Sequence, residues 1–323
     1  MTPEERQSRW EAIDRELEDL WNGRVCPDPV KREAELLAEQ DRLEYDAGCD
    51  WFRARDLERR TVEIIAPDGF HITTLDEWRD HAPPKKAMHW KAYRSAMENA
   101  RAWLRDGPCM PEELFRLLES RPETRGFWYS VSHPEHVIRL DDADGEHRNS
   151  DNTVHGSRGR KKIVIDVEAK AEEPFGSRTI GKALAKGQKK NQAYAQGNAR
   201  RQSALPTRVQ TLCRAVFGHE VDNRVSPLQY QLLYSLAAAV IEANRAGATI
   251  CALIVHEFHS TVLKPRNVAT NASALQTFIR EVPGWQNQTI GLGSLLPPIL
   301  LPGAGQVPNN ILVTIGKVRT TLT

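Results

Sequence analysis

The sequence of 323 residues contains no apolar run of the roughly 18 residues that a membrane-spanning helix needs, so no membrane association is expected. Its five cysteines lie far apart and form no CxxC pair, which excludes a disulfide framework and a cysteine-ligated zinc site. Residues 1–17 lack the apolar core of a secretory signal peptide. Together these absences predict a protein of the reducing cytoplasm.

The sequence also lacks an excess of charge of one sign. Its formal net charge is +1, so the chain as a whole does not attract nucleic acid, and a surface that binds nucleic acid must come from local clustering. Neither a glycine-rich loop that cradles phosphates nor a serine nucleophile elbow is present. These absences exclude the usual motifs of nucleotide-binding proteins and serine hydrolases.

The first 60 residues are rich in charge and carry apolar residues at helical spacing. Thr2-Pro3-Glu4-Glu5 is a helix-start signal, and Pro29 starts a second helix. We therefore expect residues 1–60 to form a helical hairpin extension and residues 61–323 to form the main domain. The extension is expected to pack on the body, on a second copy in a homo-oligomer, or on a protein partner.

The remainder of the chain mixes helical and strand patterns. Helices are predicted at 89–104, 205–217, 226–247 (with Ser226 as N-cap) and 271–282, and strands at 127–131, 136–140, 152–155, 249–258, from 163 and from 311. This order predicts an α/β fold with a mixed central sheet flanked by helices, in which the long helix after residue 226 crosses over to the buried strand at 249–258.

The stretch IVIDVEAK, residues 163–170, begins as a buried strand and then places a charge at every second position. Side chains alternate across a strand, so Asp166, Glu168 and Lys170, here called the charged row, share one face at spacings of about 7 Å. Carboxylates held this way can bind Mg²⁺, which prefers oxygen ligands and retained waters. The lysine would orient a water or offset charge, or act as a base if desolvation lowered its pKa.

A single strand cannot build a whole site, so a second acid must come from a neighbouring strand. Residues 149–170 are predicted to form an antiparallel hairpin, and Asp151 opens its first arm, 17 residues before Glu168. The plainer alternative is that the charged row is the solvated face of an edge strand, where a Glu168–Lys170 pair stabilises little. A position in the middle of the chain favours a central strand instead.

Asp151 followed by Glu168-Ala169-Lys170, on consecutive strands between a helix and a helix–strand unit, resembles the PD-(D/E)xK nuclease superfamily. The stretches VEAKAEEPFG, LQYQLLYSLAAAVIEA and ALIVHEF also resemble a restriction-endonuclease-like family of prokaryotic proteins of unknown function. The resemblance covers about residues 75–282. It does not cover the first 60 residues.

The resemblance implies a role for each matching residue. Asp151 and Glu168 would hold Mg²⁺, for which Mn²⁺ substitutes, and Lys170 would be the catalytic lysine. Glu98, on the first core helix, would be a further metal ligand, and Gln231 would be a site residue on the helix after the motif. Three departures from the superfamily pattern are the spacing of three between Gln231 and Tyr234, the replacement of the motif proline by Ser150, and the extra Asp166, whose role is open.

Two further segments carry chemistry-bearing side chains. The basic residues between 177 and 201 are expected either to follow a phosphate backbone, with Tyr194 stacking on a base, or to belong to a solvated, mobile loop. The residues singled out for this role are Lys182, Lys186, Lys189, Lys190, Arg200 and Arg201. His256 and His259 are three apart at a strand end, so His256 is expected to pack in or beside the sheet and not to bind metal.

Three functions follow from the residues and the resemblance. The leading hypothesis is a Mg²⁺-dependent nuclease that hydrolyses DNA phosphodiesters, with a role such as defence against foreign DNA. The alternative is a restriction-fold DNA-binding or regulatory protein that has lost catalysis. The third is a purely structural assembly subunit built around the N-terminal hairpin.

Overall fold

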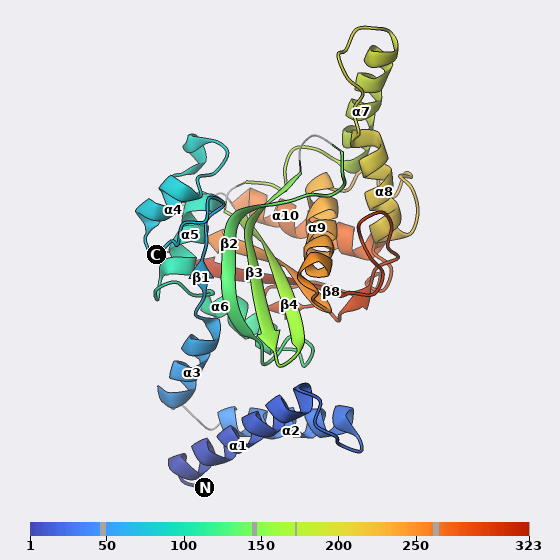
Figure 1. Ribbon diagram of the computed structural model, residues 1–323. Coiled ribbons are helices and arrows are strands. Elements are labelled where there is room, and N and C mark those ends of the chain that lie inside the picture. The colour runs from blue at the N-terminus through green and yellow to red at the C-terminus, as the bar shows by residue number, and fades with distance from the viewer. Residues whose placement is uncertain (46–49, 144–146, 172, 261–264, 323) are drawn as a thin grey trace.

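The computed structural model describes residues 1–45, 50–143, 147–171, 173–260 and 265–322. A mixed eight-stranded sheet lies at the centre of the body (Figure 1). Its strands are β1 (Glu63–Ile64), β2 (Trp128–Ile138), β3 (Arg148–Arg158), β4 (Lys161–Lys170), β5 (Ile250–His259), β6 (Ser294–Leu295), β7 (Ile299–Leu300) and β8 (Leu312–Thr321). The order across the sheet is β1-β2-β3-β4-β5-β8-β6, and β7 also pairs with β8. Strands β2, β3 and β4 form an antiparallel meander, whereas β4, β5 and β8 run parallel.

Helices cover both faces of this sheet. They are α1 (Pro3–Trp21), α2 (Pro29–Tyr45), α3 (Asp50–Arg60), α4 (Leu75–His81), α5 (Ser95–Leu104), α6 (Glu112–Glu119), α7 (Ile180–Ala195), α8 (Leu205–Phe217), α9 (Tyr230–Ala246) and α10 (Pro265–Glu281), with a short 3-10 helix at Ala87–His89. Apolar side chains of α8, α9 and α10 form one core with one face of the sheet. Side chains of α4, α5 and α6 form a second core with the other face.

These two cores explain the apolar start of β4. Ile163, Ile165 and Val167 belong to the core under α4–α6, and Val164 belongs to the core under α8–α10. Strand β4 has β3 on one side and β5 on the other, so it is a central strand of the sheet. The predicted fold class, a mixed sheet flanked by helices with an N-terminal helical extension, is confirmed.

The described residues among the first 60 form three helices where two were expected. The Thr2 side chain accepts the Glu5 N–H and Glu5 accepts the Thr2 N–H, so α1 begins with the predicted reciprocal cap. Trp10, Ile13 and Leu17 of α1 pack with apolar residues of α2 in a small core of their own, separate from the two cores of the sheet. Helix α3 then leads directly into β1.

The α1–α2 pair contacts the body at the turn between β3 and β4. The Arg158 guanidinium lies 4.3 Å from the centre of the Trp21 ring and pairs with Glu33 at 3.0 Å. Gly159, at φ +56°, allows the turn to approach closely, because a Cβ there would lie 2.9 Å from the Cβ of Trp21. Since β4 runs from this turn towards Lys170, α1 and α2 lie at the opposite end of the strand from the charged row (Figure 1).

Two segments fold differently from the expectation. The basic segment after residue 177 is helical over most of its length and forms α7, which projects from the body, while α8 returns beside it to the core (Figure 1). The long helix α9 begins at Tyr230, so Ser226 is not its N-cap. The carbonyls of Ser226 and Leu228 instead accept the N–H groups of Gly181 and Ile180, which ties this segment to the start of α7.

The sequence predicted neither disulfide bonds nor a membrane-spanning helix, and the structure can be compared with both expectations. Cys26, Cys109, Cys213 and Cys251 are free thiols, and Cys49 lies outside the described residues. Within the described ranges, no helix combines the length and the apolar character needed to cross a membrane.

Candidate active site

The charged row at the end of β4 is buried and faces α9. Glu168 is 1% exposed and Lys170 is 6% exposed, and Asp166 has no exposed surface. The Lys170 Nζ lies 2.5 Å from Glu168 Oε1. The row is therefore not the solvated face of an edge strand, and that alternative is wrong.

Asp151 joins the charged row through an interruption of the β3–β4 ladder. Regular pairing between the two strands ends at Asn152 and Val167. Beyond that point the Ala169 N–H donates to Asp151 Oδ2 at 2.7 Å, so a side-chain carboxylate replaces the backbone carbonyl as its acceptor. This bond fixes the carboxylate of Asp151 beside the segment that carries Glu168 and Lys170.

Helix α9 supplies hydrogen-bond donors to Glu168. Gln231 Nε2 donates to Glu168 Oε1 at 2.7 Å, and Ser235 Oγ donates to Glu168 Oε2 at 3.2 Å. Gln231 and Ser235 are four residues apart, so they point from the same face of the helix. The structure therefore brings Gln231 to Glu168 and adds Ser235, which the sequence reasoning did not select.

Arg148 is a site residue that the sequence reasoning missed. It is 2% exposed, and its Nη2 lies 2.9 Å from Glu168 Oε2 and 3.6 Å from Asp166 Oδ1. Its guanidinium carbon is 5.9 Å from the centre of the Tyr234 ring. In a regular strand Arg148 and Asp151, three residues apart, would face opposite sides. Only the interrupted ladder brings both to the charged row, and no sequence pattern signals it.

Asp166, whose role the sequence left open, has polar partners inside the fold. The Ser150 hydroxyl donates to Asp166 Oδ1, and Arg148 lies near the same oxygen. The hydroxyl of Ser150, the residue before Asp151, thus has a structural function. In the described part of the chain, Asp166 Oδ2 accepts no hydrogen bond.

Glu98 is buried on α5, and its carboxylate pairs with residues outside the predicted metal ligands. One oxygen of its carboxylate, Oε1, accepts the Tyr93 N–H at 2.7 Å and lies 3.0 Å from an Arg101 nitrogen. The next residue, Asn99, is the one that donates to the Asp151 carbonyl, at 3.3 Å. Among the described residues, Glu98 makes no hydrogen bond or ion pair with the other predicted metal ligands.

The segment after β4, which contains Glu173 and Phe175, connects the charged row to α5. Glu173 accepts the N–H of Ser95, the first residue of α5, at 3.1 Å and also accepts its hydroxyl. A carboxylate at a helix start is stabilising because it satisfies a donor there and faces the positive end of the helix dipole. Lys170 Nζ also lies 5.6 Å from the centre of the ring of Phe175, in the same segment.

Burial and neighbouring charges shift the pKa values of the two acids, Glu168 and Asp151, in opposite directions. Burial raises the pKa of Glu168, but the charges of Lys170 and Arg148 outweigh it, so this pKa lies below its ordinary value. Burial and the Glu168 charge raise the pKa of Asp151 to about 7. Burial lowers the pKa of Lys170, but Glu168 and Asp151 raise it above the ordinary value. The two acids thus oppose the desolvation that the hypothesis of a Lys170 base requires.

The donor set fits a magnesium ion in its chemistry. Asp151 and Glu168 supply hard oxygen ligands, and Mg²⁺ needs only one or two carboxylates beside its waters. Asp151 Oδ2 accepts the Ala169 N–H, while Oδ1 accepts no hydrogen bond from the described residues. In the described part of the chain, no group of three or more His, Cys, Asp or Glu side chains is placed, as it stands, to hold a metal ion.

Charged residues continue along the same edge of the sheet onto β5 and β8. Glu257 of β5 pairs in register with Lys170 and is 4% exposed. Lys317 Nζ lies 2.9 Å from one Glu257 oxygen, and Arg319 Nη2 lies 2.8 Å from the other. The carboxyl ends of parallel strands are a common ligand site in α/β sheets. The candidate active site therefore belongs to a group of charged residues at the carboxyl ends of β4, β5 and β8.

The predicted basic residues lie on and after the projecting helix, and we call them the basic arm. Lys182, Lys186, Lys189 and Lys190 are exposed on α7, and Arg200 and Arg201 are exposed beyond its end. The Ile180 N–H donates to the Leu228 carbonyl just before α9, the helix that carries Gln231. The basic arm therefore begins beside the charged row. The solvated loop that the sequence left open is a helix over residues 180–195.

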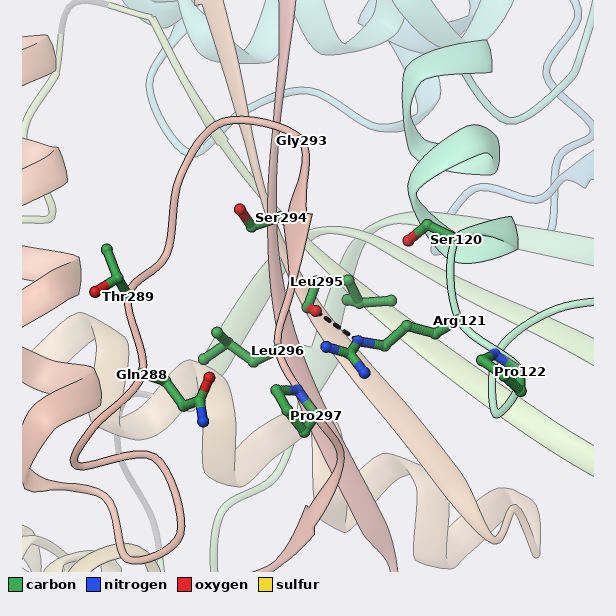
Figure 2. Close-up of a pocket in the computed structure, with 10 residues that line it drawn as sticks. All are labelled: Ser120, Arg121, Pro122, Gln288, Thr289, Gly293, Ser294, Leu295, Leu296 and Pro297. Carbon is green, nitrogen blue, oxygen red and sulfur yellow. Dashed lines mark hydrogen bonds between the residues drawn. The ribbon is translucent and has the colours of Figure 1, made fainter.

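Two surface pockets lie apart from these residues. One, of about 440 Å³, lies between the segment after α6 and the loop that leads to β6, and Arg121 donates to the Leu295 carbonyl across it at 2.6 Å (Figure 2). The other, of about 500 Å³, lies between β2, β3 and the end of α9. None of the predicted site residues lines either pocket.

A family model described as a domain of unknown function, DUF6946, matches residues 71–321. The chain belongs to the DUF6946 family. The match spans the sheet from β2 to β8, together with the five residues predicted to act together: Glu98, Asp151, Glu168, Lys170 and Gln231. The three N-terminal helices lie before it. No curated protein and no solved structure matches the chain.

Proposed function

We propose that this DUF6946 protein is a metal-dependent nuclease that hydrolyses DNA phosphodiester bonds, with a core of the PD-(D/E)xK type. The observation that carries the proposal is the hydrogen bond from the Ala169 N–H to Asp151, which fixes one acid beside the Glu168–Lys170 pair. Further support comes from the order α5, α6, β2, β3, β4, α7, α8, α9, β5, with the acids on the second and third of these strands. A role in defence against foreign DNA, in the cytoplasm, belongs to the same proposal.

Asp151 and Glu168 would hold the Mg²⁺ ion, with Glu98 as the further acid proposed for it. When bound, such an ion polarises the phosphodiester and lowers the pKa of water. The protonated Lys170 would donate to a phosphate oxygen and offset the negative charge that builds up there. Gln231 and Arg148 would orient Glu168 and keep it ionised, because they hold one oxygen each.

The basic arm gives the proposal its substrate class. Four exposed lysines on α7 and two exposed arginines after it form a cationic surface that begins beside the charged row. Such side chains bind phosphates without regard to sequence. Tyr194, 46% exposed on the same helix, offers an aromatic face on which a base can stack.

One observation favours the alternative of an inactive restriction-fold DNA-binding or regulatory protein. Both oxygens of Glu168 already have protein partners, with Lys170 and Gln231 at one and Ser235 and Arg148 at the other. Binding a cation through Glu168 would have to displace one of them. This alternative predicts DNA binding without cleavage.

The experiment compares cleavage of plasmid and single-stranded DNA by four proteins in Mg²⁺ or Mn²⁺. The proteins are the wild type, Glu168→Gln, Lys170→Met and the matched control Glu119→Gln. Glu119 pairs with the Arg59 guanidinium at 2.7 Å, away from the charged row, so its variant undergoes the same chemical change as Glu168→Gln. Cleavage by the wild type and control, reduced about 100-fold or more in the two site variants, would support the nuclease.

Other outcomes discriminate equally well. DNA binding by the wild type without cleavage in either metal would favour the inactive binding protein. Equal cleavage by the wild type and Glu168→Gln would show that the cleavage comes from another site or from a contaminating nuclease. Thermal melting of all four proteins separates lost activity from lost folding.

A further inference from the structure

Three histidines and a glutamate meet on the sheet, away from the candidate active site. His133 and His136 come from β2, His155 comes from β3, and Glu242 comes from α9. The ring centroid of His133 lies 5.6 Å from that of His136 and 5.7 Å from that of His155. Glu242 Oε1 lies 3.6 Å from His136 Nε2 and 4.0 Å from His155 Nε2. We call these four residues the histidine cluster.

Two features of the backbone assemble the histidine cluster. His155 pairs in register with Val131, which places it diagonally opposite His133 across the β2–β3 ladder. Residues 133 and 136 would face opposite sides of a regular strand. Glu135, however, has a φ of +52°, a conformation that non-glycine residues rarely adopt, and beyond it the His136 ring lies on the same side as the His133 ring.

The ring nitrogens are presented in a way that suits metal ligation. His133 Nδ1 lies 3.3 Å from the Ile65 carbonyl, so this nitrogen carries the proton and leaves the Nε2 lone pair free.

The cluster also has open space beside it. His133, His155 and Glu242 line the pocket of about 500 Å³ between β2, β3 and the end of α9. The side chain of His155 is 25% exposed and that of His136 is 32% exposed, so an ion can reach them from solvent. Arg245 Nη1 lies 3.8 Å from Glu242 Oε2, which leaves Oε1 directed at the imidazoles.

We propose that the histidine cluster binds a transition-metal cation of the zinc class through three imidazole nitrogens and the Glu242 carboxylate. In this conformation the four side chains are not placed to coordinate a metal ion together. Ligand atoms at about 2.0–2.1 Å from a tetrahedral ion lie about 3.4 Å apart, and the separations of Glu242 Oε1 from His136 Nε2 and His155 Nε2, 3.6 and 4.0 Å, exceed that spacing by less than 1 Å. This inference is independent of the proposed nuclease, whose acidic site suits Mg²⁺.

The test is isothermal titration of metal-free full-length protein with Zn²⁺, with Mg²⁺ titrated separately. We expect one equivalent of Zn²⁺ to bind the wild type and Co²⁺ to give the visible absorption of a tetrahedral site. His133→Asn, His155→Gln and Glu242→Gln should each weaken Zn²⁺ binding by more than the roughly 10–100-fold that loss of an outer-shell partner alone costs. His71→Ala is the control, because its side chain is 65% exposed and lies outside the cluster.

The proposal is overturned if the wild type binds no Zn²⁺, or if the cluster variants bind it as tightly as the wild type and the His71→Ala control do. It is also overturned if Glu168→Gln abolishes Zn²⁺ binding while the cluster variants retain it. Circular dichroism and melting curves of each metal-free variant show whether it is folded. Because three polar replacements are tested separately, failure of one to fold leaves the other two to decide.

Discussion

Asp151 and Ala169 are joined by a hydrogen bond from the Ala169 backbone N–H to the Asp151 carboxylate, at 2.7 Å, where the β3–β4 ladder ends. The bond satisfies a backbone donor in the buried part of β4, which extends from Ile163 to Lys170. It also fixes the acid beside Glu168 and Lys170. One side chain thus has a structural task that any acceptor can perform and a proposed chemical task that needs a carboxylate.

Replacing Asp151 should separate these two tasks. Asp151→Ala leaves the Ala169 N–H without its acceptor and should lower the free energy of unfolding by about 1–3 kcal/mol. Asp151→Asn keeps an oxygen acceptor and should cost less than Asp151→Ala, while still abolishing cleavage because the charge is lost. Denaturant unfolding and the plasmid assay measure the two effects. Equal destabilisation by both variants would contradict the structural task.

The buried Glu168–Lys170 pair should show strong coupling in stability. Lys170→Met leaves a buried carboxylate with Arg148 as its remaining charged partner, and removing one member of a buried pair costs about 3–5 kcal/mol. Combining Lys170→Met with Glu168→Gln removes the uncompensated charge, so the double variant should be more stable than the sum of the single losses predicts. A coupling free energy of about 0.5–3 kcal/mol is expected from the double-mutant cycle. Strict additivity would mean that the two side chains do not interact in solution.

The charged row could be located from the sequence because alternation along a strand is a local rule. The apolar residues 163–165 and the charges at 166, 168 and 170 follow the two-residue period, and the central position of β4 agrees with it. The helix of the basic arm was not recognised, because its low apolar content resembles that of a loop. In the structure Gly187 allows α7 to pack closely on α8, since a Cβ there would lie 2.6 Å from Pro206.

Arg148 and the histidine cluster could not be predicted, because both depend on departures from the regular strand. Arg148 reaches Glu168 only because β3 leaves its ladder at Asp151, and His136 shares a side with His133 only across the positive φ of Glu135. At Asp151 no neighbouring glycine or proline signals the irregularity, whereas Pro134, next to Glu135 in β2, marks an interruption of that strand without indicating on which side His136 lies. Tertiary contacts therefore decide them.

Neutralising the basic arm should weaken DNA binding without changing stability. In the triple variant Lys186→Gln, Lys189→Gln and Lys190→Gln, the salt dependence of the DNA association constant should become shallower by roughly 0.9 for each duplex phosphate that the arm no longer neutralises. The side chains are exposed, so the melting temperature should stay unchanged. The control replaces Arg24, Lys31 and Arg42, three exposed basic residues of the N-terminal helical segment, with glutamine. An unchanged salt dependence in the α7 variant would exclude the arm from the DNA interface.

His256 should make stability depend on pH. The ring is fully buried in β5, and its Nε2–H donates to Thr320 Oγ1 at 2.7 Å, because the Thr320 hydroxyl itself donates to Glu113. Its Nδ1 has no partner among the described residues, so a second proton there would be a buried donor without an acceptor. Burial accordingly lowers the pKa of His256 to about 4.

The sign of the pH effect follows from that lowered pKa. Between about pH 6.5 and pH 4 the unfolded chain binds a proton on this imidazole and the folded chain does not. The stabilisation is complete above the unfolded pKa and is lost as the pH falls through this window, by at most about 1.4 kcal/mol per pH unit from this one group. His256→Gln should flatten the dependence. Denaturant unfolding of both proteins at several pH values measures it, and parallel curves would show that another group titrates instead.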